Sequence, residues 1–151
     1  MRPTTSGLRR TRADRRIAAD PTSTALLLAG PAALELWPGV RRVGTVADRV
    51  LVEATIPEQR LSTAATVLIS PPRRTPTTYI TTFEWVGPSL PRTAGELVLS
   101  YAAGDGTPST DAALILDTEE PGALSAEALQ ELAAAFLANL ATLAESRSRA
   151  A

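Results

Sequence analysis

Apolar residues between positions 125 and 144 recur with the spacing of an α-helix. The large side chains recur at intervals of three and four positions and comprise Leu129, Leu132, Phe136, Leu137, Leu140 and Leu143. This spacing places them on one stripe of a helix. Ser125 is a suitable N-cap, because its hydroxyl can accept a hydrogen bond from a free backbone N–H group of the first turn. We therefore predict a helix over residues 125–144, whose apolar stripe needs a sheet to cover it.

In most of the chain before this helix, successive residues fall into two alternating sets, which is the pattern of β-strands, whose side chains point to opposite faces in turn. In residues 77–87 one face carries Tyr79, Thr81, Phe83 and Trp85, and the other carries Thr78, Ile80, Thr82, Glu84 and Val86. In the same way Val50, Val52, Ala54 and Ile56 alternate with Leu51, Glu53 and Thr55. Further strands are predicted over residues 11–18, 41–46, 62–70, 96–102 and 111–118, with a hairpin turn at Ala47 and Asp48 and loops over 71–76, 87–95 and 104–109.

Two short helices are predicted directly after the first strand. Asp20 can cap a helix that begins at Pro21 and ends at Gly30, because proline suits the first helical position and glycine the end. Pro31 starts a second helical turn through Leu36, and the corner 37–39 returns the chain to extended structure. The order of strand, two short helices, about six strands and a long helix predicts an α+β domain with one antiparallel sheet wrapped on the last helix.

Length and composition limit the chemistry that this chain can perform. A chain of 151 residues fits one domain, which we expect to cover residues 11–146, with a flexible tail over 1–10 and a second tail over 147–151. The sequence contains no Cys and no His, which excludes thiol nucleophiles, disulfides, imidazole bases and the commonest zinc ligands. We expect neither a metal nor a cofactor.

Charge and hydropathy give expectations about partners and compartment. All 15 basic residues are arginine and the net charge is −1, which is no indication of a nucleic-acid partner. The apolar run over residues 25–29 is too short for an export signal. Since no segment approaches the 18 or so apolar residues of a membrane span, we expect no span and a cytoplasmic location.

Four segments resemble the polyketide cyclase/dehydrase group of the START-like, or SRPBCC, superfamily. They are IAADP at 17–21, LWPGVRRV at 36–43, FEWVGPSLP at 83–91 and FLANLATLAE at 136–145, and the resemblance covers roughly residues 11–146. It implies the helix-grip fold, a curved antiparallel sheet around a long C-terminal helix with two short helices after the first strand. It also implies a mainly apolar cavity between sheet and helix. The superfamily has no universal catalytic motif, so the resemblance assigns no catalytic residue.

Six residues are candidates for ligand binding under this resemblance: Trp37, Tyr79, Phe83, Trp85, Phe136 and Leu140. Aromatic residues on the concave face of a sheet can form a stacking wall for a flat apolar ligand. Packing in the core is the alternative explanation of these residues.

Catalytic residues stay unassigned, with Tyr79, Tyr101 and Glu84 as weak candidates. Each tyrosine could donate a proton to an enolate or hold a carbonyl, or could simply point its hydroxyl into solvent. A carboxylate inside the cavity would have a raised pKa and could act as a base. The alternation argues against this role, because Glu84 is out of phase with the aromatic face and Glu53 with Val50, Val52 and Ala54.

Three functions are consistent with these residues. The first is a protein that binds an apolar, polyketide or lipid-like small molecule, in its sharpest form a polyketide cyclase, aromatase or dehydratase. The second is a non-catalytic carrier or sensor with the same cavity. The third is a module that binds another protein through a sheet edge or a helix surface. We expect a monomer or a homodimer.

Overall fold

The computed structural model describes residues 8–56, 61–87, 90–102, 106, 108–119 and 124–150. The elements are β1 (Leu8–Ile17), α1 (Pro21–Leu26), the 3-10 helix η1 (Pro31–Leu36), β2 (Val40–Val46), β3 (Arg49–Ile56), β4 (Leu61–Ile69), β5 (Arg73–Arg74), β6 (Thr78–Gly87), β7 (Leu90–Tyr101), β8 (Thr110–Glu119) and α2 (Ala126–Ala150). This is the predicted order of a strand, two short helices, a series of strands and a long helix. The α+β helix-grip architecture is therefore confirmed.

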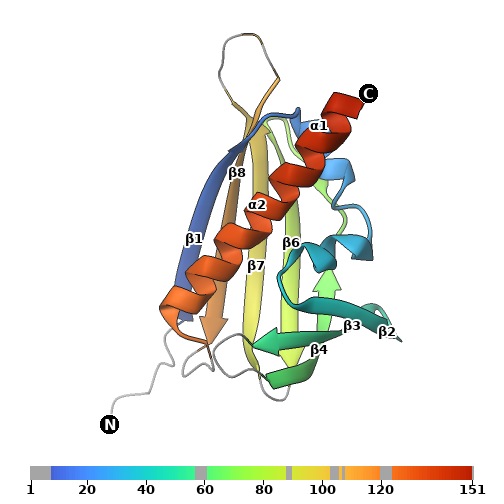
Figure 1. Ribbon diagram of the computed structural model, residues 1–151, viewed down its shortest axis with the longest axis vertical. Coiled ribbons are helices and arrows are strands. Elements are labelled where there is room, and N and C mark those ends of the chain that lie inside the picture. Colours follow the sequence, from blue (N-terminus) through green and yellow to red (C-terminus); the bar gives the residue numbers. More distant parts are fainter. Residues whose placement is uncertain are drawn as a thin grey trace.

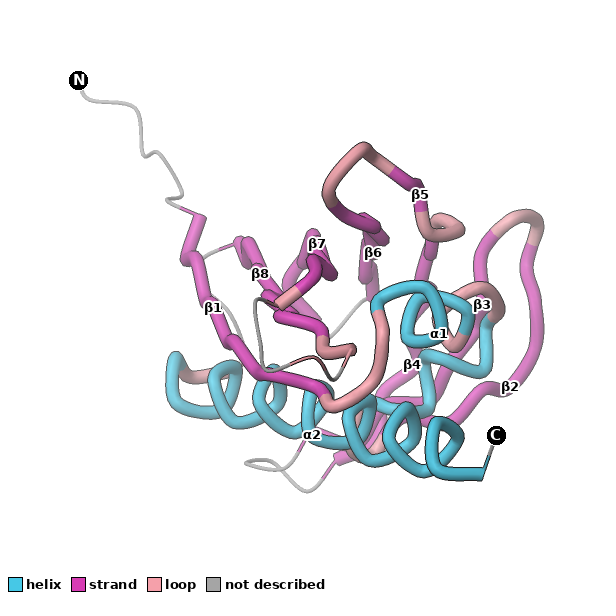
Figure 2. The backbone as a smooth tube through the Cα atoms, turned by 90° about the horizontal axis from the view of Figure 1, so that it is seen from above, coloured by secondary structure: helices cyan, strands magenta, loops and turns pink. Residues whose placement is uncertain are grey.

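All strands of the described residues belong to one antiparallel sheet. Its order is β1-β8-β7-β6-β4-β3-β2, and the short β5 pairs with β6. Figure 1 shows α2 running obliquely across β1, β8, β7 and β6, with α1 and η1 beside its C-terminal half. Seen from above, the sheet bends around α2 (Figure 2). The concave face of the sheet is therefore the face that α2 covers.

Side-chain alternation determines which residues face α2. On β6 the residues Thr81, Phe83 and Trp85 are buried, whereas Thr82 and Val86 are exposed. The same alternation on β8 buries Thr110, Ala112, Leu114, Leu116 and Thr118. Because successive side chains of a strand point to opposite faces, the in-phase residues of these strands form one continuous apolar layer.

Helix α2 buries the stripe that its sequence predicts. Leu129, Phe136, Leu137 and Leu140 are at most 3% exposed, and Ser125 Oγ accepts a hydrogen bond of 3.1 Å from the backbone N–H of Ala128. The helix continues to Ala150, so the predicted end near residue 144 is wrong. The exposed residues 146–149 need no apolar partner to remain helical, and the two arginines among them favourably oppose the negative end of the helix dipole.

The first strand starts at Leu8, so residues 8–10 are not a tail. Its register with β8 is continuous from Leu8 opposite Glu119 to Ile17 opposite Thr110. Arg10 also forms a two-pronged ion pair with Asp117, at 2.8 and 3.0 Å. Apolar periodicity missed this segment because an edge strand is held by backbone hydrogen bonds, which do not depend on apolar side chains. Residues 1–7 lie outside the described part of the chain.

Three further segments differ from the prediction. Helix α1 ends at Leu26 instead of continuing to Ala29, and β5 lies inside the predicted loop over residues 71–76. Strand β7 starts at Leu90, so residues 90–95 are strand and not loop. Gly95, which suggested a loop, lies opposite Phe83, and a Cβ atom on it would approach Leu116 Cδ2 to 2.9 Å. Glycine at this position therefore makes room for neighbouring core side chains.

Candidate functional site: the aromatic layer between the sheet and α2

Four aromatic rings from three parts of the chain meet between the sheet and α2. Trp37 follows η1, Phe83 and Trp85 lie on β6, and Phe136 is in the middle of α2. The ring centroid of Trp37 is 4.5 Å from that of Phe136, 5.8 Å from that of Trp85 and 6.3 Å from that of Phe83. Phe83 and Phe136 are 5.9 Å apart and nearly perpendicular. Such edge-to-face contacts are favourable beyond the burial of area.

Local backbone geometry brings Trp37 into this layer. The 3-10 helix ends with a hydrogen bond from Trp37 N to Leu34 O, and Gly39 then adopts a left-handed φ of +75°. That conformation turns the chain into β2, where Gly39 O accepts a hydrogen bond of 3.0 Å from Thr55 N. Asn139 of α2 donates a hydrogen bond of 2.7 Å to the carbonyl of Leu36. The corner is thus attached both to the sheet and to α2.

Five of the six predicted ligand-binding residues lie together in this interior. Trp37, Phe83, Trp85, Phe136 and Leu140 are all buried, with exposed fractions between 0% and 9%. Tyr79 is half-buried at the same face of β6, and its hydroxyl is 2.9 Å from Thr22 Oγ1 of α1. Since the Trp37 ring contacts each of the other three rings, a ligand that enters this layer has to displace it.

Three buried side-chain atoms of the described residues have no hydrogen-bond partner: the indole N–H of Trp37, the hydroxyl of Thr81 and Nη1 of Arg49. Arg49 pairs through Nη2 with Glu84 on the convex face, whereas Trp37 and Thr81, which are 6% and 1% exposed, belong to the interior. Leaving a buried donor unpaired costs about 1–3 kcal/mol. The other fully buried threonines whose contacts are known behave differently, because Thr24 and Thr110 each donate to a backbone carbonyl. Thr81 was not among the predicted site residues, although its position in phase with Phe83 and Trp85 was the available signal.

The candidate carboxylates lie on the convex face of the sheet. Glu84 accepts hydrogen bonds from Arg92 at 2.6 Å and Arg49 at 2.7 Å, and Glu53 pairs with Arg41 at 3.0 Å. The hydrogen bond from Arg92, followed by that from Arg49, holds the pKa of Glu84 below its usual value. Glu84 is therefore held as a carboxylate outside the interior, which is where the alternation of β6 predicts it to be.

Tyr101 lies at the end of β7 and is 67% exposed. Its ring is therefore mostly in solvent and does not belong to the four-ring layer.

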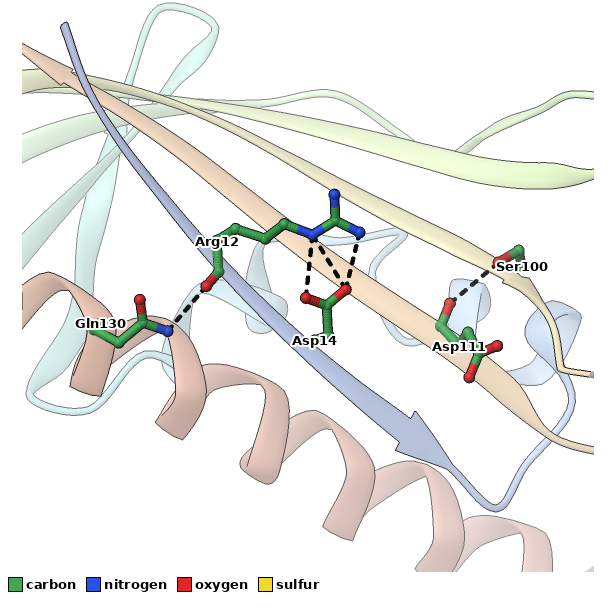
Figure 3. Close-up of polar contacts among 5 residues, drawn as sticks. All are labelled: Arg12, Asp14, Ser100, Asp111 and Gln130. Atoms are coloured by element: carbon green, nitrogen blue, oxygen red, sulfur yellow. Dashed lines mark hydrogen bonds and ion pairs between the residues drawn. The ribbon is translucent and has the colours of Figure 1, made fainter.

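The outer face also carries an open recess of about 500 Å³, which is separate from the aromatic layer. Its walls come from β1, β7 and β8 and consist of Arg12, Asp14, Arg15, Arg16, Val98, Ser100, Asp111, Ala112 and Ala113. Figure 3 shows Arg12 reaching across to Asp14, while Gln130 of α2 binds the Arg12 carbonyl at 2.9 Å. The charged side chains of its two ion pairs are 53–61% exposed, so water solvates them and the pairs contribute little stability.

Sequence comparison does not connect this chain to a known group. No protein-family model matches the sequence, and no curated protein does.

Comparison with solved structures finds proteins of similar fold. A conserved protein from Geobacillus kaustophilus has a TM-score of 0.64 at 12% identity and covers 89% of this chain and 94% of its own. The Zhui aromatase/cyclase from Streptomyces has a TM-score of 0.61 at 18% identity, covering 95% and 97%. A START superfamily protein from Mycobacterium smegmatis has a TM-score of 0.54 at 17% identity, covering 93% and 97%.

At 12–18% identity these likenesses show the fold. The chain has the helix-grip fold of START-like proteins over nearly its whole length, as the sequence resemblance predicted. In addition, none of the helices in the described ranges combines the length and the apolar character needed to cross a membrane.

Proposed function

We propose that this protein binds an apolar small molecule, polyketide-like or lipid-like, between the sheet and α2. The observation that carries the proposal is the layer formed by Trp37, Phe83, Trp85 and Phe136. Rings that meet edge to face from separate elements offer stacking surfaces on several sides of an inserted molecule. Large aromatic and aliphatic walls with few polar groups are typical of small-molecule sites.

Entry requires a movement of Trp37, because its ring contacts each of the other three rings. Trp37 sits at the end of a six-residue 3-10 helix, whereas the other three rings belong to β6 and to α2. Besides the bond from Asn139, η1 is held to β2 by a half-exposed ion pair of 3.7 Å between Glu35 and Arg42. Displacing η1 breaks these polar contacts and uncovers Ala33 and Leu34, which are buried, so the ligand has to stabilise the state in which the rings are apart.

A non-catalytic carrier or sensor is the version that the positions of the carboxylates favour. Glu53 and Glu84 face outward and are paired with arginines, so neither can remove a proton from a molecule held under α2. In this version the protein is cytoplasmic and works as a monomer or a homodimer.

A cyclase, aromatase or dehydratase acting on a polyketide is the second candidate. It is supported by the similarity of fold to an aromatase/cyclase over 95% of the chain and by the placement of Tyr79. The hydroxyl of Tyr79 lies at the edge of the interior, 2.9 Å from Thr22, and could donate a hydrogen bond to a developing oxyanion. The aromatic layer would hold the reacting chain in a folded shape and exclude water.

Titration with a fluorescent apolar naphthalene dye tests ligand binding. We expect saturable binding with one site per chain, and a clear loss of affinity in Trp85→Ala. The matched control is Val43→Ala, because Val43 is 54% exposed on β2, far from the aromatic layer in the sheet order. Absence of saturable binding to the folded wild-type protein would contradict the proposal.

Activity measurements on poly-β-ketone substrates separate the two candidates. If the protein is an enzyme, Tyr79→Phe and Trp85→Ala should lower turnover, whereas Glu84→Gln should not. Turnover that depends on Glu84 and not on Tyr79 would contradict the assignment of the interior as the reaction site. Binding without turnover supports the carrier or sensor.

A further inference from the structure

We propose that the Trp37 indole N–H and the Thr81 hydroxyl are the polar anchors of the interior site. The ligand they fit is a neutral, mainly apolar molecule that carries at least one carbonyl oxygen. This inference rests on the proposed binding function and adds the chemistry of the ligand. Its basis is that the two atoms are buried without a hydrogen-bond partner among the described residues.

Trp37 and Thr81 both neighbour Phe83 on the inner side of the sheet. The Trp37 ring contacts Phe83, Trp85 and Phe136. Thr81 is two residues from Phe83 on the same face of β6, opposite Leu97 of β7, and adjacent in-phase positions of a strand are about 7 Å apart. A ligand that stacks against Phe83 therefore lies next to both Trp37 and Thr81.

The types of the two groups determine what they can bind. An indole N–H only donates, so its partner must be an acceptor such as a carbonyl oxygen, while a threonine hydroxyl both donates and accepts. A charged acceptor is excluded by burial. The buried polar residues of the described chain are all threonines, namely Thr11, Thr24, Thr81, Thr110 and Thr118, and an anion without a buried cation would be strongly disfavoured.

Threonine at position 81 is poorly explained by packing alone. The same face of the sheet carries Val67 on β4, which pairs with β6, and Val52 on β3, one strand further, at buried positions, and valine has the shape of threonine without the hydroxyl. A hydroxyl that finds no partner in the protein destabilises the fold relative to valine. It becomes useful when a ligand supplies the missing hydrogen bond.

The test compares two probes of matched shape in the full chain. One is propionyl-dimethylaminonaphthalene, and the other is its propyl analogue, in which a methylene replaces the carbonyl. The measured quantity is the ratio of the two dissociation constants, because a change in this ratio on mutation isolates the contact with the carbonyl. Thr81→Val and Trp37→Phe should each reduce the preference for the carbonyl probe by about three- to tenfold. The emission of the bound carbonyl probe should also shift to shorter wavelength, since its carbonyl loses a hydrogen bond.

Trp85→Phe is the matched control, because it removes an indole that packs against the Trp37 ring and keeps both anchor groups, the Trp37 N–H and the Thr81 hydroxyl. This variant should weaken the binding of both probes to the same extent and leave the ratio of their dissociation constants unchanged. Thr81→Val should also raise the melting temperature of the free protein by about 2 °C or more, which shows that this variant is folded. If Trp37→Phe does not fold, Thr81→Val decides alone.

The outcomes distinguish this inference from the proposed function. If both probes bind but their ratio is the same in wild type, Thr81→Val and Trp37→Phe, the anchors are refuted and apolar binding stands. If neither probe binds the folded wild type, the proposed function fails, and the inference fails with it. If the ratio changes in only one of the two variants, the carbonyl binds the group removed in that variant, and the proposal that both groups act as anchors is refuted.

Discussion

The indole ring of Trp37 lies 4.5 Å from the phenyl ring of Phe136, tilted by 32°. This contact joins the corner after η1 to the middle of α2, two segments that are adjacent only because the sheet curves around the helix (Figure 1). Both rings also contact Phe83 of β6. Stability of the fold and access to the interior therefore depend on the same few side chains.

Truncation of Phe136 should be severely destabilising. Phe136 is 0% exposed and contacts two other rings, so Phe136→Ala should lower the free energy of unfolding by about 3–5 kcal/mol. Urea denaturation measures this change. Glu131→Ala, on the exposed side of the same helix, is the control and should stay within about 0.5 kcal/mol of wild type. A loss below about 1 kcal/mol in Phe136→Ala would mean that the stripe is not packed as described.

Substitution of Gly39, in the corner after Trp37, should destabilise the folded protein. Gly39 has a φ of +75°, and a Cβ atom on it would lie 3.3 Å from the carbonyl oxygen of Thr55. Gly39→Ala should therefore cost about 1 kcal/mol or more in unfolding free energy. Gly44→Ala on β2 is the matched control, since nothing lies within 4 Å of its added methyl group. Equal stability of the two variants would contradict the strain assigned to the corner.

Removing the hydroxyl of Thr110 should have the opposite effect to removing that of Thr81. Thr110 is fully buried and donates a hydrogen bond of 2.7 Å to the carbonyl of Ala19. Thr110→Val leaves that carbonyl unpaired and should cost about 1–3 kcal/mol, whereas Thr81→Val should stabilise. Thermal unfolding of both variants, side by side with wild type, measures the signs. Destabilisation by both changes would show that Thr81 has an internal partner.

Acid should remove the contribution of Glu84 to stability. Its pKa in the folded protein lies below the ordinary value of 4.5, because Arg92 and then Arg49 hydrogen-bond the carboxylate. A lowered folded-state pKa gives stability that is present above the unfolded-state pKa and is lost as pH falls through the folded-state value. The stabilities of wild type and Glu84→Gln should therefore differ most near neutral pH and converge as pH falls through the folded-state pKa of Glu84, which lies below 4.5. Arg92→Ala removes the largest cause of the shift and should weaken this pH dependence.

The sequence by itself determined the elements and their faces. A period of two separates Phe83 and Trp85 from Glu84, and a helical spacing assigns Phe136 and Leu140 to one stripe. Asp20, Pro21 and Ser125 indicate where helices begin, and the caps at Asp20 and Ser125 form as predicted. These features are local, because backbone geometry and nearest neighbours decide them. That is why the order of elements and the outward placement of Glu84 could be predicted.

Only the tertiary structure decided the extent of the edge strand and of β7. Residues 8–10 have no apolar periodicity, yet their backbone pairs with residues 117–119. The pattern of side chains along the sequence does not indicate this pairing. Pro91 and Gly95 are residues typical of loops. Gly95 nevertheless lies in a strand, where the absence of a side chain leaves room for Phe83 and Leu116. Both results depend on residues that are distant in sequence.

The chemistry of the interior was likewise decided by tertiary contacts. Nothing local distinguishes Thr81 from Thr110, because both are threonines in strands. Folding brings Thr110 to the carbonyl of Ala19 and surrounds Thr81 with groups that offer it no hydrogen bond. Sequence therefore determines which side chains face inward, whereas hydrogen bonding between distant segments determines which inward polar atoms stay free for a ligand.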